Sequence, residues 1–447
     1  MRAVLSFWHD ALPPEPPRPP PAGSRDADVC VVGAGFTGLW TAYALRRADP
    51  SLDVVVVEAE TAGFGASGRN GGWVLGALSG GRAHWAARAG RDGALALERA
   101  IEATVDEIGR VVAEEGIDCD WVKGGSLHVA QSALELRRVA AAAAEEGGEL
   151  LDAAAAAARV RVAGVRGAGF TPHCARVQPA KLVRGLAGAV ERAGAVIHEG
   201  TRATEIAPGA VTTPYGTVRA RFVVRATEGY TAGLPGERRT LVPLTSSMIV
   251  TEPLGAAAWE EIGWAGCETL LDGRRHYVYL QRTADGRVAI GGRGVPYRFG
   301  SDTEREGPLD AGTVTALRRR LGELFPVLRD VGVDGAWHGV LGVPRDWAPA
   351  VGLDGATGLA WAGGYVGEGV AAANLAGRTL RDLVLGRDTE LTRLPWVGGF
   401  ARPWEPEPLR FAGVRGVYSL YRAADGIERR TGRTSVVGRV ADAIAGR

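Results

Sequence analysis

The stretch from Asp26 to Glu60 constrains the fold more than any other part of the chain. It contains an apolar strand, DADVCVV, a glycine turn, GAGFTG, a helical segment that stops at Pro50, and a second apolar strand that ends at Glu58. The apolar residues of the middle segment recur at helical spacing. Two such strands joined through a helix form a βαβ unit, which belongs to a parallel sheet. The chain is therefore predicted to be an α/β protein.

The turn between the first strand and the helix matches the pattern G-x-G-x-x-G, from Gly33 to Gly38. The pattern is weak alone and becomes specific in this strand–turn–helix context. Gly33 permits the tight turn, Gly35 lets the backbone approach a pyrophosphate, and Gly38 lets the helix pack closely on the strand. The pyrophosphate would lie at the helix N-terminus, where amide donors favour negative charge. A purely structural turn is the alternative; dinucleotide binding is the prediction, and it includes the intervening residues Ala34, Phe36 and Thr37.

An acidic residue at the end of the second strand fits the same interpretation. Glu58 follows Gly38 by twenty residues, the spacing at which a carboxylate accepts hydrogen bonds from ribose hydroxyls. Its neighbours are Ala59, which we include in the predicted site, and Glu60. Because no basic residue adjoins them to bind a 2′-phosphate, NADP is disfavoured.

Two further glycine-rich stretches lie outside this unit. Residues 63–73 read GFGASGRNGGW and cannot build a core, so they form either a long surface turn or a loop against something large and polar. Near the C-terminus, GGYVGEGV lies between a strand and a helix. A second helix N-terminus there would raise the electron affinity of a flavin, whereas a tight turn is the alternative. The residues of this stretch that we predict to bind the cofactor are Gly363, Gly364, Val366, Gly367, Gly369 and Val370.

Composition excludes several classes of function. Lys+Arg 52 against Asp+Glu 51 gives a net charge of +1, too little for binding nucleic acid or an anionic membrane. No apolar run has the length of a membrane span, and the N-terminus lacks the apolar core of a signal peptide. The four cysteines are scattered, without a CxxC pair, which is typical of buried free thiols in a reducing cytoplasm. We expect a cytoplasmic protein without a metal site.

The length of 447 residues indicates two or three folded units. β-rich patterns alternate with the α/β patterns, so we expect two interleaved domains. The predicted boundaries are a Pro-rich N-terminal lead-in, 1–25; a discontinuous nucleotide-binding domain, 26–80, 160–236 and 335–390; a β-rich substrate domain, 81–159 and 237–334; and a C-terminal tail, 391–447.

Taken together, GAGFTG with Glu58, GFGASGRNGG, and GGYVGEGV ahead of NLAGRTLRDLVLG resemble the D-amino-acid oxidase-type FAD-dependent oxidoreductases, which include glycine oxidase-like enzymes. The ASGRNGG loop and the tail are most similar to the gamma-glutamylputrescine oxidoreductase branch. The resemblance extends from Asp26 to about residue 425. It implies a Rossmann-like FAD-binding domain with an interleaved β-rich substrate domain. It also implies oxidation of a carbon–nitrogen bond in a small amine or amino acid by hydride transfer to flavin N5, giving an imine that water hydrolyses, with oxygen as the electron acceptor.

The resemblance also assigns residues. It implies that Val177 contacts adenine through its backbone, and that the loop after the second strand contacts FAD through Ala66, Ser67, Arg69, Asn70, Gly71 and Gly72. Bound FAD is expected to be non-covalent, because no histidine lies near residues 58–72 and no cysteine near 337–352.

This sequence departs from the family pattern in two places. Arg345 stands only four residues before Pro349, out of register with the arginine that grips a substrate carboxylate in the amino-acid oxidases. It could reach the site, or pair with Asp346 or Glu368. In YLQRT, Gln281 replaces an arginine of the putrescine-type branch. Both departures weaken the case for an α-amino-acid substrate.

Catalytic candidates come from the strand expected to cover the flavin and from the return segment. His276 and Tyr279 are the candidates on the strand, and Arg345 is the candidate on the return segment. The alternatives are a surface or hydrogen-bonded histidine, a core tyrosine and a paired arginine. Two other functions stay open: a tailoring oxidoreductase acting on a hydroxy acid or biosynthetic intermediate, and a non-catalytic FAD-binding protein.

Overall fold

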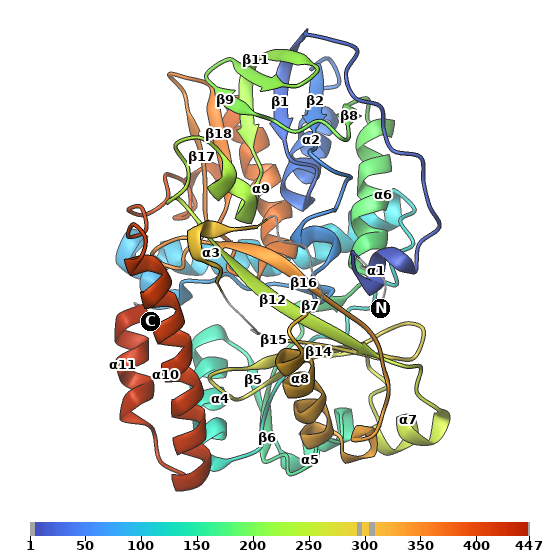
Figure 1. Ribbon diagram of the computed structural model, residues 1–447, viewed down its shortest axis with the longest axis vertical. Helices are drawn as coiled ribbons and strands as arrows, with labels where there is room; N and C mark the ends of the chain where they lie inside the picture. The colour runs from blue at the N-terminus through green and yellow to red at the C-terminus, as the bar shows by residue number, and fades with distance from the viewer. Residues whose placement is uncertain (1–4, 293–296, 304–308, 446–447) are drawn as a thin grey trace.

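Two eight-stranded sheets dominate the computed structural model, which describes residues 5–292, 297–303 and 309–445. In Figure 1 the first sheet occupies the upper half of the molecule and the second lies below it. The long strands β12 (Val242–Thr251) and β16 (Val333–Val343) belong to the second sheet, at its edge. The mixed α/β class predicted from sequence is confirmed.

The first sheet is a Rossmann-like parallel sheet in the order β17–β18–β11–β1–β2–β8. Its parallel pairs are β18–β11, β11–β1, β1–β2 and β2–β8, and β17 runs antiparallel at one edge. The hairpin β9–β10 extends β11. The strands are β1 (Arg25–Val32), β2 (Val54–Val57), β8 (Val196–His198), β9 (Glu205–Ala207), β10 (Ala210–Thr213), β11 (Gly216–Arg225), β17 (Ala350–Asp354) and β18 (Leu359–Gly363).

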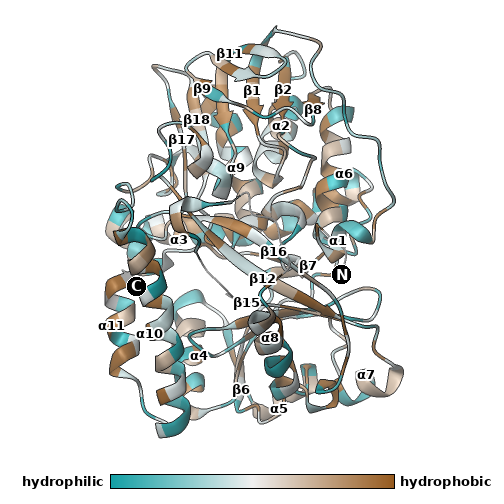
Figure 2. Cartoon of the chain, in the orientation of Figure 1, coloured by the Kyte–Doolittle hydropathy of each residue, from teal (hydrophilic) through white to brown (hydrophobic). Residues whose placement is uncertain are grey.

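Both faces of this sheet are buried, which explains why its strands are continuous apolar runs in the sequence. In β2, Val54 and Val56 belong to the core beneath the helices, whereas Val55 and Val57 belong to a smaller core on the other face. The strands β1 and β2 are accordingly brown in Figure 2. The helical face carries α2 (Phe36–Ala48), α6 (Pro179–Arg192) and α9 (Gly369–Val384), with α2 against both of the others.

The second sheet has the order β16–β12–β15–β14–β13–β4–β6–β5 and is antiparallel except between β13 and β4. Helix α8 (Ala311–Leu324) packs on it through Leu317, Leu321 and Leu324. A separate pair, β3 (Trp73–Leu75) with β7 (Cys174–Arg176), joins the two halves. The remaining strands are β4 (Ser126–Ala130), β5 (Glu149–Asp152), β6 (Gly167–Thr171), β13 (Thr269–Asp272), β14 (Val278–Arg282) and β15 (Val288–Gly292).

The boundaries drawn from the sequence differ from this arrangement in three places. Helix α3 (Gly81–Glu114) packs in the core of the first sheet rather than with the second. Strands β6 and β16, both assigned to the nucleotide-binding domain, pair within the second sheet. In interleaved domains, consecutive segments of the chain can belong to different domains. The local sequence pattern of a segment does not show which of the two cores it packs in. The smaller helices are α4 (Ala133–Glu146), α5 (Ala153–Arg159) and α7 (Ala256–Ile262).

The predicted tail, which shows no clear period in the sequence, contains the helical hairpin α10 (Leu409–Thr431) and α11 (Val436–Ala445), seen at the left of Figure 1. Its buried stripe is thin, because α10 buries Val414, Tyr418 and Tyr421 among exposed polar residues. Glu428 pairs with Arg138 at 2.7 Å and with Arg275 at 3.1 Å, which ties the hairpin to the second sheet.

The predicted lead-in, of which residues 1–4 lie outside the described part, holds a one-turn helix, α1 (Phe7–Asp10). From α1 the chain runs extended past α6 and β8 to β1 (Figure 1). Within the described ranges no helix has the length and apolar character needed to cross a membrane.

Candidate cofactor and active site

A cavity of about 1180 Å³ opens between the two sheets. Sites for small molecules typically enclose about 300–1,000 Å³, so this cavity can hold a ligand as large as a dinucleotide. Its wall comes from the β1–α2 turn, the end of β2, residues 64–70, the end of β11, strand β16 and the start of α9.

The β1–α2 turn provides one end of the cavity. Gly33 has a φ of 107°, and a Cβ there would lie 2.7 Å from the carbonyl oxygen of Ala226. A Cβ on Gly38 would overlap the carbonyl oxygen of Gly33, so only glycine fits either position. Helix α2 has Gly35 as its N-cap, which offers no side-chain cap, and its N-terminus lies in the cavity wall through Gly35, Phe36 and Thr37.

Glu58 lies in the cavity wall at the end of β2, where its Oε2 accepts a hydrogen bond from the amide of Ala34 at 2.7 Å. Burial raises the pKa of this carboxyl, whereas bonds from the amides of Glu60 and Ala34 lower it. The wall also contains Arg202, whose guanidinium pairs with Glu60 at 3.1 Å. The sequence argument against a bound 2′-phosphate considered only the neighbours of Glu58 along the chain. Arg202 belongs to the segment after β8 and lies near Glu60 only in the folded protein.

Five residues of the segment 64–70 line the same cavity: Phe64, Gly65, Ala66, Ser67 and Asn70. Ser67 Oγ accepts a hydrogen bond from the amide of Phe36 at 2.8 Å, which joins this loop to the N-terminus of α2. The two stretches predicted to contact the cofactor, the β1–α2 turn and the loop after β2, are therefore in direct contact.

The glycine cluster before α9 closes the opposite wall through Tyr365, Gly367, Gly369 and Val370. The hydroxyl of Tyr365 lies 3.0 Å from Thr37 Oγ1, which links this cluster to the β1–α2 turn. Burial raises the pKa of Tyr365 far above its ordinary value, so its hydroxyl stays protonated.

Glu228 is an acidic group of this cavity that the sequence argument missed. It follows β11, and its carboxylate accepts hydrogen bonds from the amides of Gly342 at 2.6 Å and Tyr365 at 3.0 Å. Burial raises the pKa of Glu228 to about 7, although backbone hydrogen bonds oppose the rise. A Cβ on Gly342 would overlap Glu228 Oε2, so glycine at 342 makes room for the carboxylate.

The predicted cofactor residues fall into two groups. Those that line the cavity are Gly33, Gly35, Phe36, Thr37, Glu58, Ala59, Ala66, Ser67, Asn70, Gly367, Gly369 and Val370. Those outside the lining are Ala34, Gly38, Arg69, Gly71, Gly72, Val177, Gly363, Gly364 and Val366.

Members of the second group support the wall from behind. Arg69 is buried, its guanidinium lies 4.4 Å from the centroid of the Phe64 ring, and its Nε donates to the Phe64 carbonyl. The amide of Val177 donates to the carbonyl of Gly72 at 2.8 Å. Gly364 has a φ of 75° in the turn that leads into α9.

Of the catalytic candidates, Tyr279 lies nearest to residues 66–72, the loop predicted to contact FAD. A Cβ on Gly71 would meet its ring at 2.8 Å, and its hydroxyl lies 2.9 Å from Ser246 Oγ. His276 lies elsewhere: its amide donates to Asp425 of α10 at 2.9 Å, and its ring is 6.4 Å from that of Tyr418. Neither residue lines the cavity.

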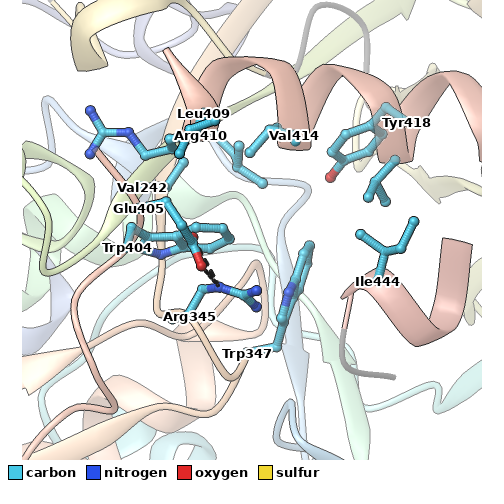
Figure 3. A pocket seen from close by; sticks show the side chains of 13 residues that line it. Val242, Arg345, Trp347, Trp404, Glu405, Leu409, Arg410, Val414, Tyr418 and Ile444 are labelled. Carbon is cyan, nitrogen blue, oxygen red and sulfur yellow. Dashed lines mark hydrogen bonds and ion pairs between the residues drawn. The ribbon is translucent and has the colours of Figure 1, made fainter. Parts of the chain in front are cut away.

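Arg345 lines a second, smaller cavity of about 130 Å³ between β12, the loop after β16 and the C-terminal hairpin (Figure 3). Its Nε donates to both carboxylate oxygens of Glu405, at 3.1 and 3.2 Å, and its guanidinium lies 5.1 Å from the ring of Trp404. The sequence suggested Asp346 or Glu368 as partners. The partner in the structure is Glu405, which only the fold brings near.

A family model described as FAD dependent oxidoreductase matches residues 28–383. The chain belongs to this family. FAD is therefore its cofactor, and the chain is an FAD-dependent oxidoreductase.

Relatives of this FAD-dependent oxidoreductase span most of its length. A probable oxidoreductase OrdL of Haemophilus influenzae is 30% identical over 417 residues, which cover 87% of this chain and 90% of the relative. The gamma-glutamylputrescine oxidoreductase of Escherichia coli is 32% identical over 410 residues, with coverage of 84% and 89%. Among solved structures, glycine oxidase from Geobacillus kaustophilus superposes with a TM-score of 0.68 at 21% identity, covering 81% of this chain and 96% of that one. That likeness concerns the fold, and the family resemblance read from the motifs is confirmed.

The observed cavity fits FAD. It has a glycine turn at the N-terminus of α2, the carboxylate of Glu58 at the end of β2 and a second helix N-terminus in the opposite wall. Non-covalent attachment of FAD stays a prediction. Glu228 could have been anticipated, because ligands of open α/β sheets lie at the carboxyl ends of the strands. Arg202 had no comparable signal.

Proposed function

We propose that this flavoprotein oxidises a carbon–nitrogen bond of a small amine or amino acid. The substrate would lose two electrons to give an imine, which water hydrolyses to a carbonyl compound, and oxygen would take up the electrons as hydrogen peroxide. The observation that carries the proposal is the cavity itself, whose cofactor walls lie against the second sheet at β16. The relative named gamma-glutamylputrescine oxidoreductase supports the reaction class.

Named residues account for how FAD would be held. The β1–α2 turn and the first amides of α2 would bind the pyrophosphate, and Glu58 would accept hydrogen bonds from the ribose hydroxyls. Residues 64–70 and the start of α9 would contact the remaining parts. FAD when bound supplies the two-electron acceptor for such an oxidation.

The substrate-facing side is proposed to be the face of the second sheet that carries Tyr279 and Ser246. Their mutual hydrogen bond positions a phenol hydroxyl next to the loop that contacts the cofactor. Arg345 is engaged with Glu405, and the side chain of Gln281 donates to the carbonyls of Gly71 and Val177. These engagements favour a substrate without an essential α-carboxylate. Tyr279 is the catalytic candidate that the placement favours over His276 and Arg345.

The experiment is an anaerobic titration of the purified holoenzyme with a panel of amines and amino acids, followed by admission of air. The expected result is loss of the visible flavin absorbance with one amine class, and formation of peroxide in air. Reduction by a hydroxy acid and by no amine would favour the tailoring oxidoreductase instead. No reduction by any donor would favour a non-catalytic FAD-binding protein. Reduction without peroxide would identify a dehydrogenase.

Tyr279→Phe, which keeps the ring and removes the hydroxyl, separates a role of that hydroxyl in the reaction from a role of the ring in packing. The cytoplasmic location stays a prediction that cell fractionation tests.

A further inference from the structure

The cofactor loop has an unusual backbone arrangement: seven consecutive carbonyls, from Ala66 to Gly72, all accept hydrogen bonds from other parts of the protein or from a side chain of the loop. Asn70 Nδ2 donates to the carbonyls of Ala66 and Ser67, at 3.2 and 2.7 Å. The donors to the next five carbonyls are Ser6 Oγ at 3.1 Å, Trp337 Nε1 at 2.8 Å, Trp8 Nε1 at 2.9 Å, Gln281 Nε2 at 2.5 Å and the amide of Val177 at 2.8 Å.

Two of these donors come from the N-terminal segment that the sequence presented as a lead-in. Ser6 and Trp8 are 0% and 1% exposed. A helix of one turn is unstable alone, so α1 owes its structure to its packing. The Trp8 ring lies 5.8 Å from the ring of Trp337 in an edge contact, and Gln178 Nε2 donates to the Trp8 carbonyl at 2.7 Å.

His9 completes the contact with the loop. A Cβ on Gly68 would overlap the His9 ring, so glycine at 68 is required for α1 to dock. His9 Nδ1 lies 2.7 Å from Ser6 Oγ. Because Ser6 Oγ donates to the carbonyl of Gly68, His9 must carry its proton on Nδ1. Burial, with help from Arg69, lowers the pKa of His9 to about 4, so the ring is neutral at physiological pH.

The Pro-rich stretch anchors α1 to the nucleotide-binding half. The amide of Arg18 donates to Glu199 at 2.8 Å, and its side chain pairs with Glu191. Glu199 also accepts from the amide of Ala62, just before the cofactor loop. A stiff proline segment loses little entropy when it is held in this way.

We propose that Ser6 and Trp8 are positioning residues for FAD, which hold the carbonyls of Gly68 and Asn70 on the side of the loop away from the cavity. A loop held in its binding conformation binds more tightly, because the apparent affinity falls with the fraction of molecules in that conformation. The N-terminal segment is thus part of the cofactor site, although Ser6 and Trp8 do not line the cavity.

The test compares Trp8→Phe and Ser6→Ala with Trp264→Phe in the full-length holoenzyme. Trp264 is also fully buried, and its Nε1 donates to a carbonyl, that of Glu268, at 2.9 Å, in the core of the second sheet. Each phenylalanine variant therefore removes one buried indole N–H and leaves an aromatic ring. The measurements are the FAD dissociation constant, from flavin fluorescence after dilution, and the temperatures of FAD release and of unfolding, the latter by circular dichroism.

We expect Trp8→Phe to raise the FAD dissociation constant about five- to tenfold and Ser6→Ala by a smaller factor, since one hydrogen bond to a carbonyl of the loop is lost in each. In both, FAD release should precede unfolding. Trp264→Phe should lower the unfolding temperature and leave the dissociation constant within twofold of the parent. The proposal is overturned if Trp8→Phe and Ser6→Ala bind FAD as the parent does, or if Trp264→Phe weakens FAD equally. Ser6→Ala removes a single oxygen, so it decides the matter if Trp8→Phe does not fold.

Discussion

The two glycine-rich walls of the cofactor cavity are built in different ways. In the β1–α2 turn, Gly38, in the first turn of α2, packs on Gly33 five residues away. In the loop at 66–72, the carbonyls of residues 68–72 are held by donors from α1, β14 and β16 and from residues just before α1 and α6. Local geometry forms the first wall and tertiary contacts form the second. Changes within the turn should therefore act on folding, whereas changes around the loop should act first on FAD binding.

The largest effect is expected at Gly38. Gly38→Ala places a methyl group against the carbonyl of Gly33, so the free energy of unfolding should fall by about 3 kcal/mol and FAD binding should weaken strongly. Urea unfolding and the flavin content of the purified protein measure both. Gly416→Ala is the matched control, because Gly416 lies within α10 with open space around it and alanine should raise stability slightly. Parent-like unfolding of Gly38→Ala would mean that the turn is not locally constrained.

The next effect concerns Glu228, whose carboxylate joins Gly342 of β16 to Tyr365 in the turn before α9. Its pKa is raised from 4.5 to about 7 in the folded protein. Protonated Glu228 is therefore favoured by folding: the associated stability is present below pH 4.5 and is lost as the pH rises through 7. Glu228→Gln cannot titrate. Relative to the variant, the parent should lose about 2 kcal/mol between pH 5 and pH 8, allowing for partial exposure to the cavity.

Urea unfolding of parent and Glu228→Gln at the two pH values measures this difference. The carboxylate accepts amide hydrogen bonds on both oxygens, and the amide of the variant accepts on one only, which adds a constant offset. A difference between the two proteins that is the same at pH 5 and pH 8 would show that Glu228 does not titrate in this range.

A smaller effect is expected at Trp337, which holds the carbonyl of Arg69 from the second sheet. Trp337→Phe should raise the FAD dissociation constant about fivefold, similar to Trp8→Phe, because each removes one neighbouring donor. Fluorescence titration measures it. If Trp8→Phe weakens FAD and Trp337→Phe does not, the loop is held from the N-terminal segment alone, and the contrast between the walls needs that refinement.

The smallest effect is expected at Arg345, outside both walls. Arg345→Met breaks its pair with Glu405, in which both side chains are partly exposed, so stability should change by less than about 1 kcal/mol and the FAD dissociation constant should not change. Thermal unfolding and fluorescence titration test this. A marked loss of FAD would show that the second cavity communicates with the first.

Several features were predictable because they are local. Gly33 and Glu58 could be assigned to the cofactor cavity from motif and spacing, and Ser67 from the family resemblance; all three line it. Glu228 had a signal in its position after a parallel strand. The helices of the tail were missed because their buried stripe is thin. The pairing of Arg345 with Glu405 and the presence of Arg202 in the cavity wall could not be predicted, since both depend on how distant segments of the chain pack together.

The order of apolar strands, glycine turn and helix in the first sixty residues was enough to specify a parallel sheet with a dinucleotide site, because these elements form from residues close in the chain. The fold alone determined what holds the other wall. Four of its donors stand in stretches of the sequence that match no motif: Ser6, Trp8, Gln281 and Trp337. They reach the carbonyls of one loop only after the second sheet and the N-terminal segment have packed against that loop. A backbone carbonyl takes whichever donor the packing brings within reach, and no local pattern records that choice.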